Sequence, residues 1–412
     1  MSDPYFPSLK DIMTAEHTLN DILVPTPLMK NRNLSDKYEA NIFLKREDLQ
    51  MVRSYKIRGA YNKIKSLTPE EMEKGVVCAS AGNHAQGVAF SCSKLGIQGK
   101  IYMPVTTPRQ KINQVKMFGG KSIEVVLTGD TFDQANTAAI EACKKNDMVF
   151  IPPFNDPRII EGQATVGLEI IQEARMKLDY IFVPIGGGGL ATGVSTLAKL
   201  LNPKIKVIGV EPAGANCMQA SFAAGKVTTL PTVSTIADGT AVKTPGSKIF
   251  PYIRQNLDDI ITVEDDELVA AFLDMVENHK MIVENSGLLT VAALKHLDVS
   301  DKRIVSILSG GNMDVITMSS VVQQGLILRD RIFTVSVLLP DKPGELCKVS
   351  GIIAAQQGNV IKLEHNQFVT TNRSAAVELR ITLECFGTDH KKQIIKALEK
   401  EGYKPKVVRT SL

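Results

Sequence analysis

The sequence predicts an α/β protein with an open, mostly parallel sheet, followed by a smaller ferredoxin-like unit. Three observations predict this class. Over the first 330 of 412 residues, short β-branched runs alternate with longer helical patterns. Several of these runs end in clusters of Gly, Pro, Ser or Asn. Near residues 325–331 the pattern changes, and the remaining elements follow the order βαββαβ, which can form its own small core.

The expected strands of the first part are short apolar runs separated by helical segments, which favours parallel strands covered by helices on both faces. They are residues 41–44, 76–78, 100–103, 123–126, 148–151, 180–183, 207–210 and 304–308. In such sheets the ligand crevice lies outside the carboxyl ends of the strands. The loops that follow the strands are therefore where functional residues are expected.

The second part begins with a strand at 332–339 and a turn at 341–344. The later elements are a helix ending near 357, strands at 360–363 and 376–383, a basic helix at 390–402 and a strand at 405–408. Residues 331–412 hold 13 Lys and Arg against 8 Asp and Glu, which leaves 35 against 36 for the rest. This shift supports two domains, 1–325 and 326–412, with a small subdomain of the first at roughly 46–150.

Composition excludes several classes of protein. Hydrophobic residues make up 44% and charged residues 22%, which are ordinary values for a globular chain, and the net charge of +4 gives no reason to expect nucleic acid. None of the six cysteines forms a Cys-x-x-Cys pair, so no zinc site is expected. The chain shows no signal peptide and no apolar stretch of ~18 residues, so a cytoplasmic protein without membrane contact is expected. The cysteines are interpreted as small core hydrophobes.

The most informative loop follows the predicted strand at 180–183. It contains Gly186, Gly187, Gly188 and Gly189, followed by Leu190 and a helix. Glycines let the backbone approach a ligand closely, and N–H groups at a helix start attract an anion. A phosphate fits this loop, although a flexible tight turn remains an alternative. No Lys-Ser/Thr pair follows, so the loop is not a Walker motif.

A second feature is Lys56, which lies in the run Ser-Tyr-Lys-Ile-Arg-Gly-Ala. Apolar neighbours could desolvate its amine and lower the pKa of that amine, as imine chemistry requires. An ordinary solvated helix lysine is the competing interpretation.

Two further strand-end loops carry small and polar residues. One is Ser80-Ala81-Gly82-Asn83-His84, whose backbone N–H groups suit a carboxylate, although an N-cap formed by Ser80 or Asn83 explains it equally well. The other begins at Ser309 and reads Ser-Gly-Gly-Asn. Alone, this last loop is a weak signal.

Together, the four motifs closely resemble the fold-type II pyridoxal-phosphate (PLP) enzymes of the threonine/serine dehydratase group, over about residues 10 to 325. The phrases SYKIRGA, SAGNHAQGVA, GGGGL and SGGN occur in the order of that family. The resemblance implies two open sheet subdomains and loss of ammonia from L-threonine to give 2-oxobutanoate, with L-serine as a slower substrate. Serine dehydration, a PLP β-replacement reaction and an inert amino-acid-binding regulator are the alternatives.

The resemblance also implies roles for individual residues. Lys56 would bind PLP covalently and move the α-proton, and Ser309 would bond the pyridine nitrogen. A hydroxyl cannot keep that nitrogen protonated as a carboxylate can, which favours elimination over transamination. The remaining cofactor contacts would come from Tyr55, Asn83, Gly186, Gly187, Gly188, Gly189 and Leu190. The substrate carboxylate would meet the loop formed by Ser80, Ala81, Gly82, Asn83 and His84.

Five positions refine the resemblance. Relatives that racemise serine have a second serine where this chain has Ala81, so racemisation should be poor. Some relatives bind a divalent cation, and here Glu211 and Ala215 match that pattern but Cys217 does not. No metal is therefore expected, apart from a weak cation site at Glu211 and Ala215. Glu284 matches an acidic residue that lines the cofactor in relatives.

The second part resembles an ACT regulatory domain through Leu-Pro-Asp-Lys-Pro-Gly-Glu-Leu at 339–346 and Gly-Asn-Val at 358–360. An isoleucine or valine effector is expected between two such units, in a homodimer or homotetramer, and a purely dimerising domain is the alternative. RNA binding is not expected, because the aromatic stacking signature is missing. The effector residues would be Asp341, Pro343, Gly344, Glu345, Leu346 and Asn359. The sequence leaves a biosynthetic and a degradative role equally open.

Overall fold

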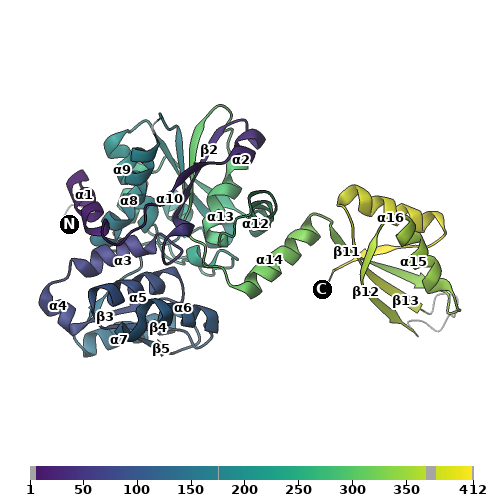
Figure 1. The fold of residues 1–412 in the computed structure, drawn as a ribbon, viewed down its shortest axis with the longest axis horizontal. Coiled ribbons are helices and arrows are strands. Elements are labelled where there is room, and N and C mark those ends of the chain that lie inside the picture. Colours follow the sequence, from purple (N-terminus) through teal and green to yellow (C-terminus); the bar gives the residue numbers. More distant parts are fainter. Residues whose placement is uncertain (1–5, 175, 368–376, 411–412) are drawn as a thin grey trace. The chain divides into compact units, whose positions relative to one another are not determined.

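The computed structural model describes residues 6–174, 176–367 and 377–410. The chain divides into two compact units, Met1–Asp314 and Val315–Leu412 (Figure 1). The first unit contains two sheets and the second contains one. No helix in these described ranges is both long and apolar enough to cross a lipid bilayer.

The larger sheet of the first unit has six strands, of which all but the edge strand β1 run parallel. In spatial order they are β1 (Leu28–Lys30), β2 (Asn41–Arg46), β10 (Arg303–Leu308), β7 (Tyr180–Pro184), β8 (Lys206–Pro212) and β9 (Asp259–Val263). Neither β1 nor β9 was among the predicted strands. β1 has only three residues, all partly exposed or exposed, and β9 has one neighbour, so neither carries the buried apolar run that marks the inner strands.

The smaller sheet of the first unit has four parallel strands. In spatial order they are β5 (Ile123–Leu127), β4 (Gly99–Met103), β3 (Val76–Ala79) and β6 (Val149–Phe150). Every predicted strand of the first part is present, with bounds that differ by one or two residues. We call this sheet and the helices packed on it the small lobe, and the six-stranded sheet with its helices the large lobe.

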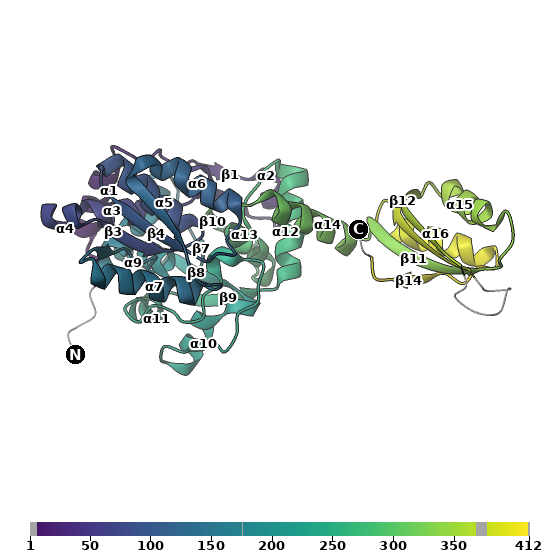
Figure 2. The same cartoon turned by 90° about the horizontal axis from the view of Figure 1, so that it is seen from below.

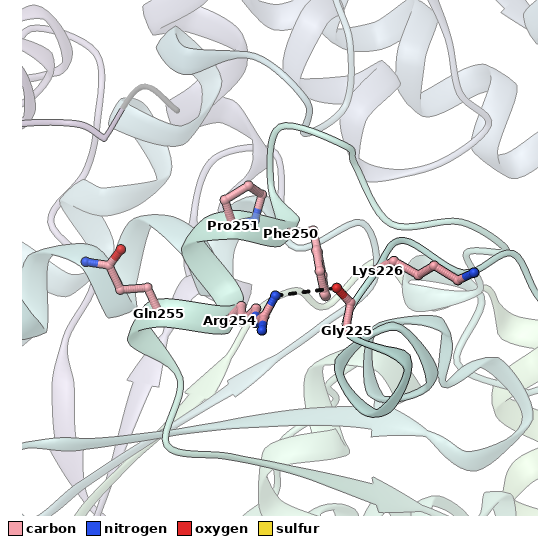
Figure 3. Close-up of a pocket in the computed structure, with 6 residues that line it drawn as sticks. All are labelled: Gly225, Lys226, Phe250, Pro251, Arg254 and Gln255. Carbon is pink, nitrogen blue, oxygen red and sulfur yellow. Dashed lines mark hydrogen bonds between the residues drawn. The ribbon is translucent and has the colours of Figure 1, made fainter. Parts of the chain in front are cut away.

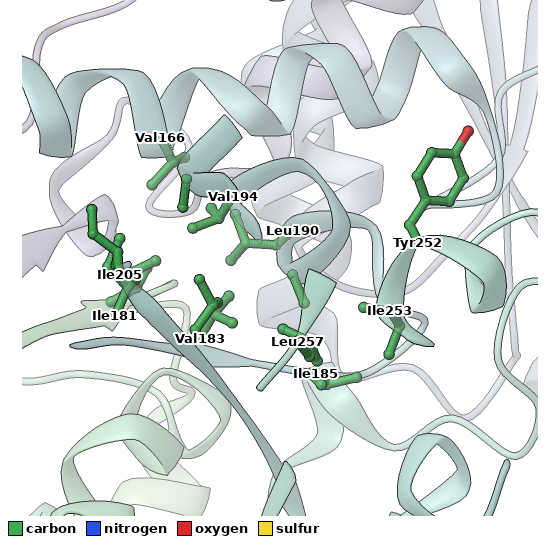
Figure 4. Packing of buried hydrophobic residues seen from close by; sticks show 14 of the residues in the cluster. Val166, Ile181, Val183, Ile185, Leu190, Val194, Ile205, Tyr252, Ile253 and Leu257 are labelled. Atoms are coloured by element: carbon green, nitrogen blue, oxygen red, sulfur yellow. The ribbon is translucent and has the colours of Figure 1, made fainter. Parts of the chain in front are cut away.

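Helices cover both faces of each sheet, as buried parallel strands require. In the large lobe, α8 (Pro157–Glu173) and α9 (Gly189–Leu201) bury apolar residues against β7, β8 and β10 (Figure 4). α12 (Asp265–His279) packs on α13 (Asn285–Ala292), which contacts β7, β8 and β10.

The small lobe is covered in the same way (Figures 1 and 2). On one side of the sheet lie α3 (Lys56–Lys65), α5 (Asn83–Leu95) and α6 (Arg109–Gly119). A separate cluster packs α7 (Phe132–Lys145) against Val77, Ala79 and Tyr102.

Shorter elements complete the first unit. They are α1 (Leu9–Leu19), α2 (Arg32–Lys37), α4 (Pro69–Lys74), α10 (Cys217–Ala224), α11 (Phe250–Asn256) and the 3-10 turns η1 (Glu47–Leu49), η2 (Gly120–Ser122), η3 (Ala213–Ala215), η4 (Asp238–Thr240) and η5 (Ala293–His296).

The second unit follows the predicted βαββαβ order after a first helix. Its elements are α14 (Val315–Leu328), β11 (Ile332–Leu339), α15 (Glu345–Ala355), β12 (Asn359–Asn366), β13 (Val377–Glu384), α16 (Thr388–Lys400) and β14 (Lys406–Val408). The antiparallel sheet has the order β12-β13-β11-β14, and α15 and α16 bury their apolar faces against it. The predicted strand at 376–383 begins at Val377, and residue 376 lies outside the described residues.

The cysteines fit the interpretation as core residues only in part. Cys78, Cys92, Cys217 and Cys385 are buried, but Cys143 is half-buried and Cys347 is exposed. All six are free thiols.

Candidate active site

Lys56 is the first residue of α3, and its amine points into the protein. Its Nζ donates to the carbonyl oxygen of Pro153 at 2.9 Å and lies 5.3 Å from the ring centroid of Tyr55. The side chain is half-buried, which contradicts the competing interpretation as a solvated lysine. Burial lowers the pKa of the amine to about 8, and the charge of Glu284 opposes that shift. Roughly a tenth of the amine is therefore uncharged at pH 7, far more than for an ordinary lysine.

The glycine tract follows β7 and leads directly into α9. Gly188 has φ +95°, which strains any other residue, and a Cβ on Gly187 would lie 2.2 Å from the Phe154 ring. A Cβ on Gly189 would lie 3.1 Å from Phe154. Among the described residues, no acceptor contacts the backbone N–H groups of Gly186, Gly187 or Gly188. These donors, at the start of a helix, suit an anion such as a phosphate.

Pro153 and Phe154 connect the amine to the glycine tract. Pro153 accepts from Lys56, and the next residue packs on Gly187 and Gly189. The amine and the tract, which lie 130 positions apart in sequence, therefore share one wall of the site. Neither residue was predicted as part of the site, because the segment after β6 carries no motif that marks it.

Ser309 follows β10 and lies against the loop that carries Lys56. Its carbonyl oxygen accepts from the N–H of Tyr55 at 3.2 Å, and the next residue, Gly310, forms a β-bridge with Ser54. Ser309 is 4% exposed. Its hydroxyl is a neutral group that can donate or accept a hydrogen bond with a ligand bound beside the Lys56 loop.

The Ser80–His84 loop joins β3 to α5, but it is not capped as the competing interpretation proposed. The N-cap of α5 is Gly82, without a side-chain cap, and Ser80 Oγ accepts from the Gly82 N–H at 3.2 Å. Ala81 is half-buried in the same turn. The ring of His84 is buried, and its Nε2 lies 2.9 Å from the carbonyl oxygen of Ile151.

His84 is neutral in this position. Burial and the nearby charge of Lys56 lower the pKa of its ring to about 3. Because the Ile151 oxygen can only accept, Nε2 carries the proton and donates it to that oxygen. The ring therefore ties the start of α5 to the segment that follows β6.

Asn83 and Asn312 form a hydrogen-bonded group with Glu284. Asn83 Nδ2 donates to Glu284 Oε1 at 2.7 Å, and Asn312 Nδ2 donates to Asn83 Oδ1 at 2.6 Å. Glu284 is buried, which raises the pKa of its carboxyl to about 7, with a further contribution from the charge of Asp238. The site therefore contains an amine and a carboxyl that both titrate near neutral pH, as acid/base chemistry requires.

Glu211, the acid of the possible cation site, is buried near the end of β8. The two carboxylate oxygens of Glu211 accept from the N–H groups of Met218 and Gln219 at 2.9 and 2.8 Å. Burial raises the pKa of Glu211 to about 8. Ala215 and Cys217 are both buried beside it, and in the described part of the chain no group of three or more His, Cys, Asp or Glu side chains could hold a metal.

The expected effector residues lie around the start of α15 and on β12 of the second unit. Asp341, Pro343, Gly344, Leu346 and Asn359 are exposed, whereas Glu345 is buried. The carboxylate of Glu345 accepts from Lys348 at 2.9 Å and from the Tyr403 hydroxyl at 3.1 Å. Asn359 donates to Glu384 at 3.1 Å.

A surface hollow of about 550 Å³ lies elsewhere in the first unit (Figure 3). It is lined by Gly225, Lys226, Phe250, Pro251, Arg254 and Gln255. None of these residues belongs to the four motifs, so this hollow is separate from the candidate active site.

The chain belongs to the pyridoxal-phosphate dependent enzymes, whose family model matches residues 19–310. This range includes the first three motifs of the site and, of the fourth, Ser309 and Gly310. Among curated proteins, the chain is 42% identical over 398 residues to the biosynthetic L-threonine dehydratase IlvA of Halalkalibacterium halodurans, covering 96% of this chain and 95% of that protein. It is also 42% identical to the Bacillus subtilis enzyme of the same name, over 87% of this chain and 86% of that protein.

Solved structures agree with this assignment. Processed threonine deaminase isoform 2 from Solanum lycopersicum matches with a TM-score of 0.72 and 39% identity, covering 78% of this chain and 95% of that one. Maize serine racemase matches with a TM-score of 0.73 and 34% identity, over 79% of this chain and all of that one. The first unit therefore has the fold of type II PLP enzymes.

The residues of the site fit PLP. A phosphate needs several convergent donors, and the N–H groups of the glycine tract supply them. An aldehyde needs an amine that is partly uncharged, which Lys56 supplies. A pyridine nitrogen needs one neutral polar partner, and Ser309, next to the loop that carries Lys56, offers a hydroxyl.

Proposed function

We propose that this enzyme converts L-threonine into 2-oxobutanoate and ammonia, and L-serine into pyruvate more slowly. The observation that carries the proposal is the Lys56 amine, whose pKa is lowered to about 8. The amine donates to the carbonyl oxygen of Pro153, and the ring of the next residue, Phe154, packs on the glycine tract. The names of the H. halodurans and B. subtilis relatives support threonine as the substrate and a biosynthetic role.

Bound PLP supplies an electron sink for the carbanion formed at the substrate Cα. The chain supplies the remaining groups. Lys56 binds the cofactor and, once displaced by the substrate amine, takes the α-proton on Nζ. The N–H groups of Gly186 to Gly189 and the start of α9 at Leu190 hold the phosphate, while Tyr55 packs against the ring and Asn83 contacts its hydroxyl oxygen.

The choice between reactions is set by Ser309. A neutral hydroxyl offers the pyridine nitrogen a hydrogen bond but no compensating negative charge, so the nitrogen stays unprotonated. A less electron-poor ring leaves more electron density at Cα, which favours departure of the β-hydroxyl. We therefore assign elimination, rather than transamination, to this site.

The substrate carboxylate is assigned to the loop formed by Ser80, Ala81, Gly82, Asn83 and His84, whose backbone turns at the start of α5. Ala81 has no group that could exchange a proton on the face opposite Lys56. We therefore propose little racemisation, in spite of the similarity to maize serine racemase.

The test is Lys56→Ala, compared with Lys65→Ala, which changes an exposed lysine of the same helix. We expect Lys56→Ala to lose the visible absorbance of the bound cofactor and the production of 2-oxobutanoate, and Lys65→Ala to keep both. Retention of both signals by Lys56→Ala would overturn the assignment. Formation of cysteine from sulfide and an activated serine, without loss of ammonia from threonine, would instead indicate a β-replacement enzyme.

We also propose that residues 326–412 form an ACT-like regulatory domain that follows a catalytic domain at 1–325. Its sheet order and helices match a ferredoxin-like unit, and the exposed Asp341–Gly344 loop with Leu346 and Asn359 offers a surface for isoleucine or valine between two copies of the chain. We further propose that the protein is a homodimer or homotetramer in the cytoplasm. Calorimetry and threonine kinetics with each amino acid test it, and the absence of both heat and inhibition would favour a purely dimerising domain.

A further inference from the structure

One segment of the large lobe contacts the small lobe through two ion pairs. In one pair the segment supplies the carboxylate, and in the other it supplies the amine. Asp238 Oδ2 lies 2.6 Å from Nζ of Lys111 on α6, and Lys243 Nζ lies 3.8 Å from Oδ2 of Asp133 on α7. Lys111 and Asp133 both belong to helices that pack on the sheet of the small lobe (Figure 1). We call residues 238–243 the bridging segment.

The bridging segment also packs against the candidate active site. A Cβ on Gly186 would lie 3.0 Å from Cα of Thr240, so the segment touches the first residue of the glycine tract. A Cβ on Gly239 would lie 2.9 Å from Ser286 Oγ and 3.8 Å from Glu284 Oε1. These distances leave no room for the segment to move inwards, so its position on the large lobe is set by packing.

The Lys111–Asp238 ion pair is the shorter and less exposed of the two. The side chain of Lys111 is 19% exposed and that of Asp238 is 67% exposed, and Lys111 also experiences the negative charges of Glu284 and Asp314. Lys243 and Asp133 are 52% and 75% exposed and lie farther apart, so solvent screens that pair more. The amine of Lys111 is thus the main charge that joins the small lobe to the bridging segment.

α6 transmits this attachment to the substrate loop. Gln114, one turn after Lys111 on α6, accepts from Nε2 of Gln86 on α5 at 3.1 Å. α5 begins at Asn83, within the Ser80–His84 loop assigned to the substrate carboxylate. The glycine tract lies on the large lobe and the carboxylate turn on the small lobe, so the spacing between the lobes determines whether both can hold one substrate–cofactor pair.

We propose that the bridging segment holds the small lobe in place at the active site, an attachment that we call the clasp. Lys111 and Asp238 are then positioning residues for the amino-acid substrate. The inference rests on the proposed function for the identity of that substrate. Neither residue contacts the reacting atoms. Their effect is to hold the carboxylate turn at the distance from the glycine tract that an α-amino acid needs.

The test uses the full-length holoenzyme with Lys111→Met and Lys111→Arg. We expect Lys111→Met to raise the KM for L-threonine about fivefold with kcat within about twofold of wild type, because binding geometry is lost while Lys56 and Ser309 are untouched. Lys111→Arg keeps the charge and should restore most of the KM. Hydrogen–deuterium exchange without threonine should be faster in residues 238–243 of Lys111→Met.

The matched control is Lys74→Met, which removes an ion pair of the same 2.6 Å length to Asp147 within the small lobe. It should match wild type in KM and in exchange at 238–243. A wild-type KM and unchanged exchange in Lys111→Met would overturn the clasp, as would failure of Lys111→Arg to restore the KM. If the wild-type protein does not consume threonine at all, the proposed function fails, and the exchange experiment still decides whether the clasp exists.

Discussion

Asn83 and Glu284 lie 201 positions apart in sequence, yet Asn83 Nδ2 donates to Glu284 Oε1 at 2.7 Å. Asn83 begins α5 of the small lobe, and Glu284 is the N-cap of α13 in the large lobe. The bond therefore crosses between the lobes at the site that also contains Lys56. It also places a buried carboxyl group where its charge affects both stability and the pKa of the amine.

The first prediction concerns the pH dependence of stability. The pKa of Glu284 is raised to about 7 in the folded state from an ordinary value of 4.5, so the folded protein binds its proton more tightly than the unfolded chain does. Between about pH 4.5 and 7 this group therefore makes the free energy of unfolding fall as pH rises. Glu284→Gln keeps an acceptor for Asn83 but cannot titrate. We expect Glu284 to lower the wild-type free energy of unfolding by on the order of 1–3 kcal/mol over this pH range, and the variant to lack this decrease.

Urea unfolding of the cofactor-free protein at pH 5 and pH 8 measures this difference. The comparison that matters is the change between the two pH values, not the absolute stability of either protein. If wild type and Glu284→Gln show the same change, Glu284 is ionised in the folded state at both pH values, contrary to its burial.

The sequence could predict the four loops of the site because each one follows a recognisable strand and carries small or polar residues. It could not predict that Phe154 and Pro153 belong to the site. Phe154 packs on the glycine tract and Pro153 accepts a hydrogen bond from Lys56, and these partners lie more than 30 positions away in sequence. It also missed Asp238, which occurs in an ordinary turn and gains significance only from Lys111 opposite. Local patterns determine the elements, whereas the distances between their loops depend on how the two sheets pack.

The second prediction tests the role of Ser309. Ser309→Asp places a carboxylate at the position assigned to the pyridine nitrogen, and its negative charge would favour protonation of that nitrogen. We expect transamination to increase about tenfold relative to elimination, a change of ~1.4 kcal/mol in the difference between two barriers. The ratio is measured as conversion of the cofactor to its amine form per 2-oxobutanoate released. Ser309→Ala is the control, since it removes the hydroxyl without adding charge, and an equal ratio in both variants would contradict the account.

The third prediction concerns the glycine tract. Gly187→Ala would place a Cβ 2.2 Å from the ring of Phe154, so one of the two must move. We expect an overpacking cost of about 1–3 kcal/mol in unfolding free energy, together with weaker cofactor binding. Phe154→Ala in the same chain makes room for the new methyl group. The double variant should therefore be less destabilised than the sum of the two single variants.

The control for this experiment is Gly351→Ala on α15, where an added Cβ meets nothing within 4 Å. That substitution should be neutral or slightly stabilising, because alanine favours a helix. Strict additivity of Gly187→Ala and Phe154→Ala would show that the tract does not depend on the ring.

The fourth prediction concerns Arg58, two residues after Lys56, whose fully buried guanidinium bonds Glu47 at 2.7 and 2.8 Å and Glu169 at 2.7 and 2.9 Å. Arg58→Met leaves the buried carboxylate of Glu47 without its cation, so we expect a loss of about 3–5 kcal/mol in urea unfolding. Adding Glu47→Gln removes that uncompensated charge and should recover part of the loss. Arg32→Met breaks an exposed pair with Asp36 and should leave stability unchanged. If Arg58→Met is as stable as Arg32→Met, the buried network does not anchor α3, and the position of Lys56 must depend on the apolar packing of that helix alone.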